Sequence, residues 1–178
     1  MAYNFTPGKR LGDYNFIFRE DGEFVTKSTS DLFAGKRVIV FSLPGAFTPT
    51  CTNYQLPGFD DLYDEFKNQG IDEIYCISVN DGFVMNAWAE SLGIENVKMI
   101  PDGNADFTDY MDMLVGKYNL GFGERSWRYA MVVDDMVVEH FVAEDGMEDD
   151  AEEDPYEKTT PSKLLEYVTI NKVVTLEN

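Results

Sequence analysis

Residues Arg37–Thr52 read RVIVFSLPGAFTPTCT, and this stretch predicts a strand, a tight loop and the start of a helix. Its first seven residues form a nearly continuous apolar run, which is typical of a strand buried on both faces of a sheet. Pro44-Gly45 ends that run. Thr48 is a preferred N-cap residue and Pro49 suits the first helical position, so we expect Cys51 to lie in the first turn of the helix.

The segments on either side of this stretch alternate between strand and helix patterns. Before it, Asp21-Gly22 stands between two aromatic and β-branched runs, 14–18 and 24–29, and predicts a hairpin. Apolar residues spaced by three or four continue the helix as far as Gly70, and Pro57-Gly58 should kink it. The later expected elements are a strand at 71–79, a helix at 81–92, a strand at 97–100, a helix at 107–115, a hairpin of 127–133 with 136–142, and a helix from Thr160-Pro161.

The order of these elements predicts the fold class. A strand, a helix and a strand in succession imply a right-handed parallel crossover, and the late hairpin adds antiparallel strands. We therefore expect an α/β fold, a mixed sheet flanked by helices that resembles a thioredoxin core with a β-hairpin added at the N-terminus. A length of 178 residues suits one domain and is too short for two ordinary ones. The expected single domain spans 1–178, with an acidic surface loop at 144–157 and a C-terminal helix and tail at 160–178.

The composition excludes several classes of function. The chain has 14 Lys+Arg against 33 Asp+Glu, and its net charge of −19 would repel nucleic acid and anionic membrane surfaces. Met1 to Lys9 contain no apolar signal core, and no window approaches the roughly 18 apolar residues of a membrane span, so we expect a cytoplasmic protein. Two cysteines and one histidine are too few for a disulfide scaffold or a zinc site, and we expect no metal and no cofactor.

Residues 144–157 form the one strongly biased segment, with nine acidic residues among fourteen. Such a charge block repels itself and stays hydrated, which favours a solvated surface loop. A cation or partner site is the alternative. Asp149–Asp154 does not match the EF-hand pattern, because no Gly and distal Glu stand at the required offsets.

The expected position of Cys51 favours nucleophilic chemistry. In the first turn of a helix the backbone N–H groups lack intrahelical partners and the macrodipole presents its positive end, so a thiolate is stabilised there. The Thr48 hydroxyl, three residues earlier, can point toward the same pocket. Pro44 offers an apolar wall and has no N–H that would compete for the sulfur. The alternative for Cys51 is a structural cysteine near a helix cap.

These residues carry a resemblance to a known family. Pro44, Thr48 and Cys51 form the pattern P-x-x-x-T-x-x-C. With the surrounding GAFTPTC, this pattern resembles the active site of the type II (atypical, peroxiredoxin-five-like) peroxiredoxins, in particular the plant and bacterial glutaredoxin-linked members. The resemblance covers most of the chain and continues through 77–81, 83–88 and 123–129. The acidic loop and the C-terminal tail match poorly.

The resemblance implies a thiol-dependent peroxidase that reduces hydrogen peroxide and alkyl hydroperoxides. Cys51 would be the peroxidatic nucleophile and become a sulfenic acid, Thr48 would orient the peroxide, and Pro44 would shield the thiolate. Arg125 would complete the site as a permanent cation that donates to the bound peroxide. Arg128 is a weaker candidate in the same region, and a surface salt bridge is the alternative for Arg125.

The sulfenic acid must then be reset by a thiol. Cys76 lies 25 positions after Cys51 and could close an internal disulfide, but its strand pattern indicates a packed thiol that is difficult to reach. No cysteine follows Cys76, so we expect an external reductant, with glutathione and glutaredoxin favoured over thioredoxin. The resemblance also implies a homodimer, with Phe47, Phe83 and Phe122 as apolar contacts.

Two other functions fit the same sequence. A cysteine-dependent hydrolase or thiol transferase would need a base or a CxxC motif, and His140 is the one imidazole that could pair with Cys51. A redox-sensing relay or holdase chaperone with a thioredoxin-like core is the non-enzymatic alternative. Saturable peroxide turnover would distinguish these from a peroxidase.

Overall fold

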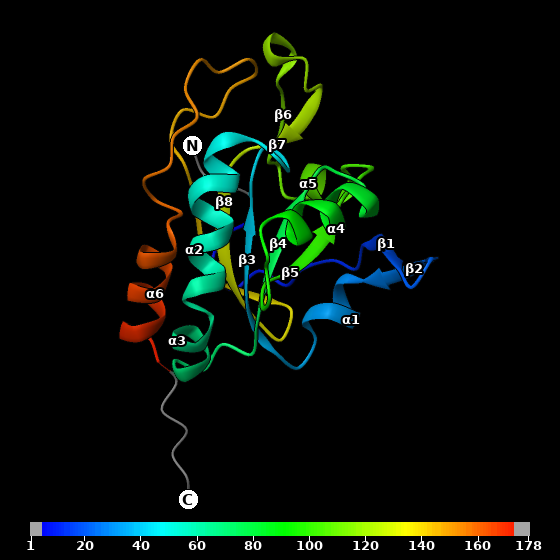
Figure 1. Cartoon of the computed structure of the whole chain (residues 1–178). Helices are drawn as coiled ribbons and strands as arrows, with labels where there is room; N and C mark the ends of the chain where they lie inside the picture. The colour runs from blue at the N-terminus through cyan, green and yellow to red at the C-terminus, as the bar shows by residue number, and fades with distance from the viewer. Residues whose placement is uncertain (1–4, 173–178) are drawn as a thin grey trace, which may run out of the picture.

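A five-stranded mixed sheet forms the centre of the fold in the computed structural model, which describes residues 5–172 (Figure 1). Its strands are β3 (Arg37–Ser42), β4 (Glu73–Ser78), β5 (Lys98–Pro101), β8 (Tyr129–Asp134) and β9 (Val137–Ala143). They lie in the order β5-β4-β3-β8-β9. The pairs β3–β4 and β4–β5 are parallel, whereas β3–β8 and β8–β9 are antiparallel. The predicted mixed α/β sheet and its late hairpin are confirmed.

One face of this sheet is packed against helices that close over Cys51. The helices are α2 (Leu56–Asp61), α3 (Tyr63–Asn68), α4 (Gly82–Ser91) and α6 (Pro161–Ile170). Their apolar side chains form one hydrophobic cluster with Ile39, Phe41 and Cys76 of the sheet. Trp88 of α4 is among the largest buried side chains in it. Because Cys51 belongs to the same cluster, its thiol faces a packed apolar layer.

The opposite face is covered by α1 (Thr29–Phe33) and α5 (Asp106–Tyr110). Beside them lies the hairpin of β1 (Asn15–Glu20) and β2 (Glu23–Ser28), whose two-residue turn is Asp21-Gly22. The predicted N-terminal hairpin is therefore confirmed. None of the helices within residues 5–172 is long and apolar enough to cross a membrane.

The helix predicted over 107–115 is wrong in its second half. Asp112 has φ 56°, in the left-handed region, which interrupts the helix after α5. The next residues form β6 (Leu114–Gly116), which pairs antiparallel with β7 (Glu124–Ser126) around the short 3-10 helix η2 (Tyr118–Leu120). Tertiary strand pairing thus overrides the local helical pattern, and the β6–β7 hairpin projects from one end of the molecule (Figure 1).

The helix predicted after Thr48 is divided, and its kink is not where the sequence placed it. Helical backbone begins at Pro49 as expected, and Cys51–Gln55 then form a π-helix, η1. The Leu56 N–H donates to the carbonyl of Cys51, five residues back. This wide turn directly precedes Pro57, which has no N–H to donate to a helical hydrogen bond. The break between α2 and α3 falls at Leu62 instead.

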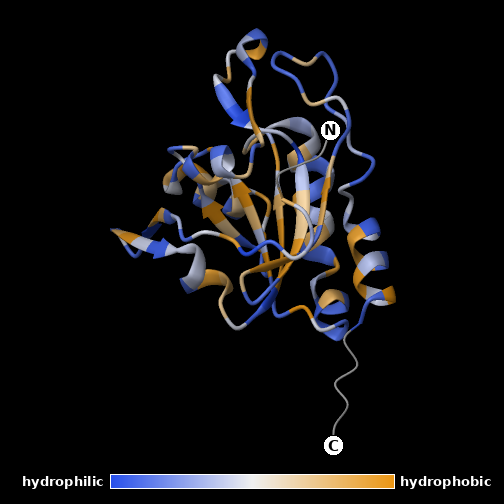
Figure 2. Ribbon diagram, turned by 180° about the vertical axis from the view of Figure 1, so that it is seen from behind, coloured by the Kyte–Doolittle hydropathy of each residue, from blue (hydrophilic) through white to orange (hydrophobic). Residues whose placement is uncertain are grey.

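The acidic segment lies beside the β6–β7 hairpin in Figure 1, and Figure 2 shows it as mostly hydrophilic. The sequence predicted a solvated loop, but part of the segment is buried. Glu144 is 1% exposed, and its carboxylate accepts hydrogen bonds from the N–H groups of Glu157 and Lys158. Asp149 accepts one from the Gly116 N–H at 2.7 Å. These carboxylates replace water as partners of backbone donors and hold the loop in place.

Candidate active site

Cys51 lies in the first turn of the helical segment that follows β3, as the sequence predicted. The Thr52 N–H donates to the Thr48 carbonyl at 2.9 Å and closes this turn. Trp88 of α4 fixes it from the other side, because the indole Nε1 donates to the Thr52 hydroxyl at 3.0 Å. The Cys51 side chain is buried, and the residue is 1% exposed. The sulfur is therefore shielded from bulk solvent.

Arg128 is the cation at this sulfur. Its Nη1 donates to Cys51 Sγ at 3.4 Å and also to Gln55 Oε1, and the side chain is 1% exposed. Burial disfavours the guanidinium charge, but the Cys51 thiolate and the Asp154 carboxylate outweigh it and raise the pKa of Arg128. Its Nε is buried and has no hydrogen-bond partner among residues 5–172. That donor is therefore available to a ligand.

Thr48, Pro44 and Arg125 form the loop next to the thiol. The Thr48 hydroxyl donates to the Gly45 carbonyl at 2.6 Å, which fixes the rotamer of the threonine. Arg125 Nη1 donates to the Pro44 carbonyl at 3.2 Å and Nε to the Phe122 carbonyl at 3.1 Å. A side chain at Gly45 would collide with Arg125 Nη1, so the glycine permits this approach. Burial lowers the pKa of Arg125.

The two candidate arginines thus occupy different places. Arg128, the weaker candidate from the sequence, contacts the thiol itself. Arg125, the favoured candidate, contacts the backbone of the loop that carries Pro44 and Thr48. Gln55 received no role from the sequence, although it stands four residues after Cys51 and so on the same side of a helical turn. That spacing is the signal that could have found it.

Cys76 lies on β4, opposite Phe41 of β3, and is 0% exposed. Burial raises the pKa of its thiol well above the usual range, and the negative charge of Cys51 raises it further. The Cys76 side chain is therefore a protonated thiol in the packed interior of the sheet, which agrees with the strand position predicted from the sequence. Both cysteines are free in this structure.

Comparison with known proteins identifies the family. The redoxin family pattern matches residues 8–158. A peroxiredoxin from Rhizobium etli is 59% identical over 140 residues, which are 79% of this chain and 78% of that protein. The chain belongs to the peroxiredoxins of the redoxin family. It is therefore a thiol-dependent peroxidase, as the motif around Cys51 implied.

Two solved structures show how far the peroxiredoxin fold extends over this chain. An antioxidant protein of Plasmodium falciparum, described as a 1-Cys peroxiredoxin, has a TM-score of 0.89 at 34% identity and covers 94% of this chain and 100% of its own. A reduced peroxiredoxin of Vibrio vulnificus in complex with hydrogen peroxide has a TM-score of 0.83 at 35% identity, covering 92% and 99%. The thioredoxin-like architecture predicted from the sequence is confirmed.

His140 of this peroxiredoxin stacks on a tyrosine instead of facing the nucleophile. Its ring lies 3.9 Å from that of Tyr167 in α6, at an interplanar angle of 9°. Burial lowers the pKa of His140, and the neighbouring Glu139 only partly offsets that effect. The imidazole is thus committed to packing between β9 and α6, which removes the contact that a cysteine–histidine hydrolase would need.

The aromatic residues considered as dimer contacts have unequal exposure in this peroxiredoxin. Phe47 is 55% exposed and Phe83 is 56% exposed. Phe47, in the loop before the nucleophile, has φ 63°, a left-handed backbone conformation that few residues other than glycine adopt. Phe122 is partly buried and lies 5.2 Å from the guanidinium of Arg125.

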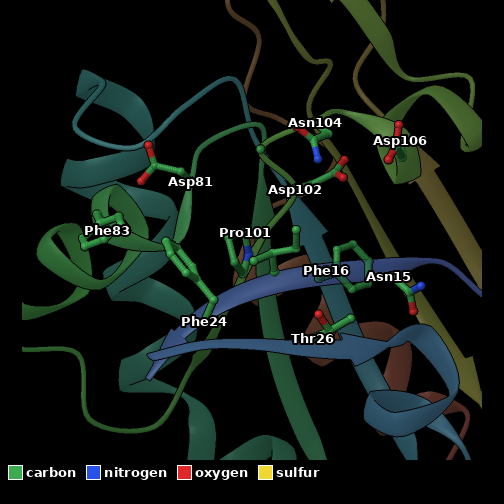
Figure 3. Close-up of a pocket in the computed structure, with 13 residues that line it drawn as sticks. Asn15, Phe16, Phe24, Thr26, Asp81, Phe83, Pro101, Asp102, Asn104 and Asp106 are labelled. Atoms are coloured by element: carbon green, nitrogen blue, oxygen red, sulfur yellow. The ribbon is translucent and has the colours of Figure 1, made fainter. Parts of the chain in front are cut away.

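A separate cavity of about 570 Å³ lies between the N-terminal hairpin and the loops after β4 and β5 (Figure 3). Cys51, Arg128 and Thr48 do not line it. Its buried carboxylate, Asp102, accepts hydrogen bonds from the N–H groups of Phe107 and Thr108, and burial raises its pKa. Asp102 therefore caps α5 and is already satisfied. Within residues 5–172 no cluster of three His, Cys, Asp or Glu side chains is arranged to hold a metal ion.

Proposed function

We propose that this peroxiredoxin reduces hydrogen peroxide and alkyl hydroperoxides through Cys51. The contact between Arg128 Nη1 and Cys51 Sγ in a buried first turn is the observation that carries the assignment. The thiolate attacks one peroxide oxygen and the O–O bond breaks. The departing oxygen takes the electron pair and a proton and leaves as water or an alcohol, while the sulfur becomes a sulfenic acid. A known peroxide complex of a peroxiredoxin with 35% identity supports hydrogen peroxide as a substrate.

In this proposal four residues bind the peroxide, orient it or stabilise the reacting sulfur and the loop beside it. Arg128 donates from Nη1 to the sulfur and offers its unpartnered Nε to the oxygen that gathers charge. The Thr48 hydroxyl, fixed by its bond to Gly45, orients the peroxide through its remaining lone pairs. Pro44 shields the thiolate, and Arg125 holds the Pro44 carbonyl and adds positive charge beside the loop.

The sulfenic acid is reset by an external thiol in this cycle. Cys76 is 0% exposed and remains a protonated thiol, so it is poorly placed to resolve Cys51. Because Cys51 itself is 1% exposed, a tripeptide thiol such as glutathione reaches the sulfur more readily than a protein thiol does. This favours glutathione with glutaredoxin over thioredoxin. The similarity to a protein described as a 1-Cys peroxiredoxin supports the same cycle.

We also propose that the chain works in the cytoplasm as a homodimer of single-domain subunits. The exposed rings of Phe47 and Phe83 support the dimer, since large apolar side chains that stand out from a surface favour association. Sedimentation analysis of the wild type against Phe83→Ser tests this point, and a wild type that is monomeric at micromolar concentration would contradict it.

The decisive experiment compares the wild type, Cys51→Ser and Cys76→Ser. The intact mass of each protein is measured by mass spectrometry after treatment with one equivalent of peroxide. Steady-state peroxide turnover is measured separately with glutathione plus glutaredoxin and with thioredoxin. We expect Cys51→Ser to be inactive and Cys76→Ser to keep most activity. The oxidised wild type should gain one oxygen or, with glutathione present, a glutathionyl adduct. A loss of two hydrogens that requires Cys76 would contradict the one-cysteine cycle. Peroxide consumption without saturable turnover would favour a redox relay.

A further inference from the structure

We propose that Asp154, on the acidic segment, is a positioning residue for peroxide reduction because it holds the guanidinium of Arg128 in its working orientation. The inference rests on the proposed role of Arg128 at the thiol. It gives the acidic segment, which neither the motif nor the charge pattern connected with the active site, a part in the reaction.

The contact is direct and involves both carboxylate oxygens. Arg128 Nη2 donates to Oδ1 and to Oδ2 of Asp154, each at 2.8 Å. The arginine side chain is 1% exposed, whereas that of Asp154 is 43% exposed. Asp154 therefore closes the solvent side of a guanidinium whose other end contacts Cys51 Sγ.

The chain on both sides of Asp154 is anchored, so the carboxylate is not on a freely moving loop. Before it, the Asp150 N–H donates to the Gly116 carbonyl at 2.8 Å, and the Asp150 carboxylate accepts from the Asn119 N–H at 3.0 Å. After it, the buried Glu144 carboxylate accepts from the Lys158 N–H. These bonds place Asp154 within a segment held by the β6–β7 hairpin and by the end of β9.

Two further residues that follow Asp154 in the chain support Arg128, one directly and one through Gln55. The Tyr156 ring lies 5.6 Å from the Arg128 guanidinium, within the range of a cation–π contact. The Thr159 carbonyl and hydroxyl accept from Gln55 Nε2 at 3.4 Å, and Gln55 Oε1 in turn accepts from Arg128. The acidic segment therefore contacts Arg128 directly, and Thr159, just after the segment, contacts it through Gln55.

The planar guanidinium makes this arrangement consequential. Nη1 is used by Cys51 and Gln55 and Nη2 by Asp154, so these bonds fix the plane and hence the direction of the free Nε. Without Asp154, the group keeps its charge but can rotate and expose Nη2 to water. Attack on a peroxide depends on donor alignment, whereas attack on an alkyl iodide needs the nucleophile but no donor at a departing oxygen.

The test compares Asp154→Asn and Asp154→Glu with Glu153→Gln, a neighbouring exposed residue that undergoes the same loss of charge. Second-order rate constants for Cys51 are measured in stopped flow with hydrogen peroxide and separately with iodoacetamide. We expect Asp154→Asn to lower the peroxide rate about tenfold or more and the iodoacetamide rate by less than about threefold. Asp154→Glu should restore most of the peroxide rate, and Glu153→Gln should match the wild type.

Three results would overturn the inference. They are an unchanged peroxide rate in Asp154→Asn, an equal fall of both rates, or an equal effect of Glu153→Gln. Thermal unfolding of each variant checks that the segment remains folded, and Asp154→Glu keeps the test valid if Asp154→Asn is unstable. Failure of the proposed function is a separate outcome, because it would appear as full peroxide reactivity in an Arg128 variant.

Discussion

Replacing Arg128 should slow oxidation of the thiol far more than replacing Arg125. Arg128→Ala removes the donor 3.4 Å from Cys51 Sγ, whereas Arg125→Ala removes a donor to the Pro44 carbonyl. Arg128→Lys keeps a positive charge, but an ammonium group cannot reproduce the planar contacts with Cys51, Gln55 and Asp154 together.

The size of the effect follows from the distance and the burial. Two unit charges 3.4 Å apart attract by about 5 kcal/mol at an effective dielectric constant of about 20. The Asp154 carboxylate at 2.8 Å from Nη2 offsets part of that attraction. Loss of one preorganised donor at a reacting centre costs about 10²–10³-fold, so we expect about 10²-fold for Arg128→Ala. We expect about tenfold for Arg128→Lys and less than about threefold for Arg125→Ala.

The assay is the second-order rate constant for oxidation by hydrogen peroxide, followed by tryptophan fluorescence in stopped flow. Trp88 is a suitable reporter because its Nε1 donates to the hydroxyl of Thr52, the residue after the nucleophile. Circular dichroism and thermal unfolding control for damage to the fold. An Arg128→Ala rate within about threefold of the wild type, or an equal loss in Arg125→Ala, would refute the reasoning from distance.

Two further predictions concern Thr48 and Glu139. Thr48→Ser should keep most of the peroxide rate and Thr48→Val should lose it, because the hydroxyl bonded to Gly45 does the orienting; equal damage measured in the same stopped-flow assay would indicate packing instead. Burial acts to raise the pKa of Glu139, but hydrogen bonds from Arg37 and Tyr167 outweigh it and lower the pKa. The stability this gives is present above the unfolded-state pKa of about 4.3 and is lost as the pH falls through the lower folded value. Urea unfolding should therefore show a steeper loss of stability below about pH 4 in the wild type than in Glu139→Gln, and equal slopes would contradict it.

The sequence predicted those parts of the site that depend on local chain direction. Local pattern alone predicted the first-turn position of Cys51, from the strand, the Pro44-Gly45 stop and the Thr48-Pro49 helix start. The late hairpin was also predicted, but its two-residue turn is Asp135-Met136, with φ values of 45° and 69°, one residue later than the turn between the predicted strands 127–133 and 136–142.

The parts that depend on distant pairing were not predictable in the same way. Arg125 and Arg128 are three residues apart, and their different directions follow from the pairing of β7 with β6 and of β8 with β3. No local pattern contains that information. The helix predicted over 107–115 was partly wrong for the same reason, because the strand at Leu114–Gly116 forms by pairing with later residues, Glu124–Ser126. The acidic segment was predicted to be solvated from its charge alone, and charge does not indicate which backbone N–H groups donate to its carboxylates.

Because Cys51 is buried, the size of the reactant affects the two halves of the cycle differently: peroxide oxidises the thiol, and a thiol then reduces the sulfenic acid. At 1% exposure the sulfur is more easily reached by a small molecule than by a protein thiol, which must wait for the turn to open. Opening disrupts part of a packed cluster, so it carries an activation enthalpy that the diffusion of a small molecule does not. Cooling would then arrest recovery through a protein thiol before it arrests oxidation. The enzyme would collect in its oxidised form in the cold, where a small diffusible thiol would be the faster route back.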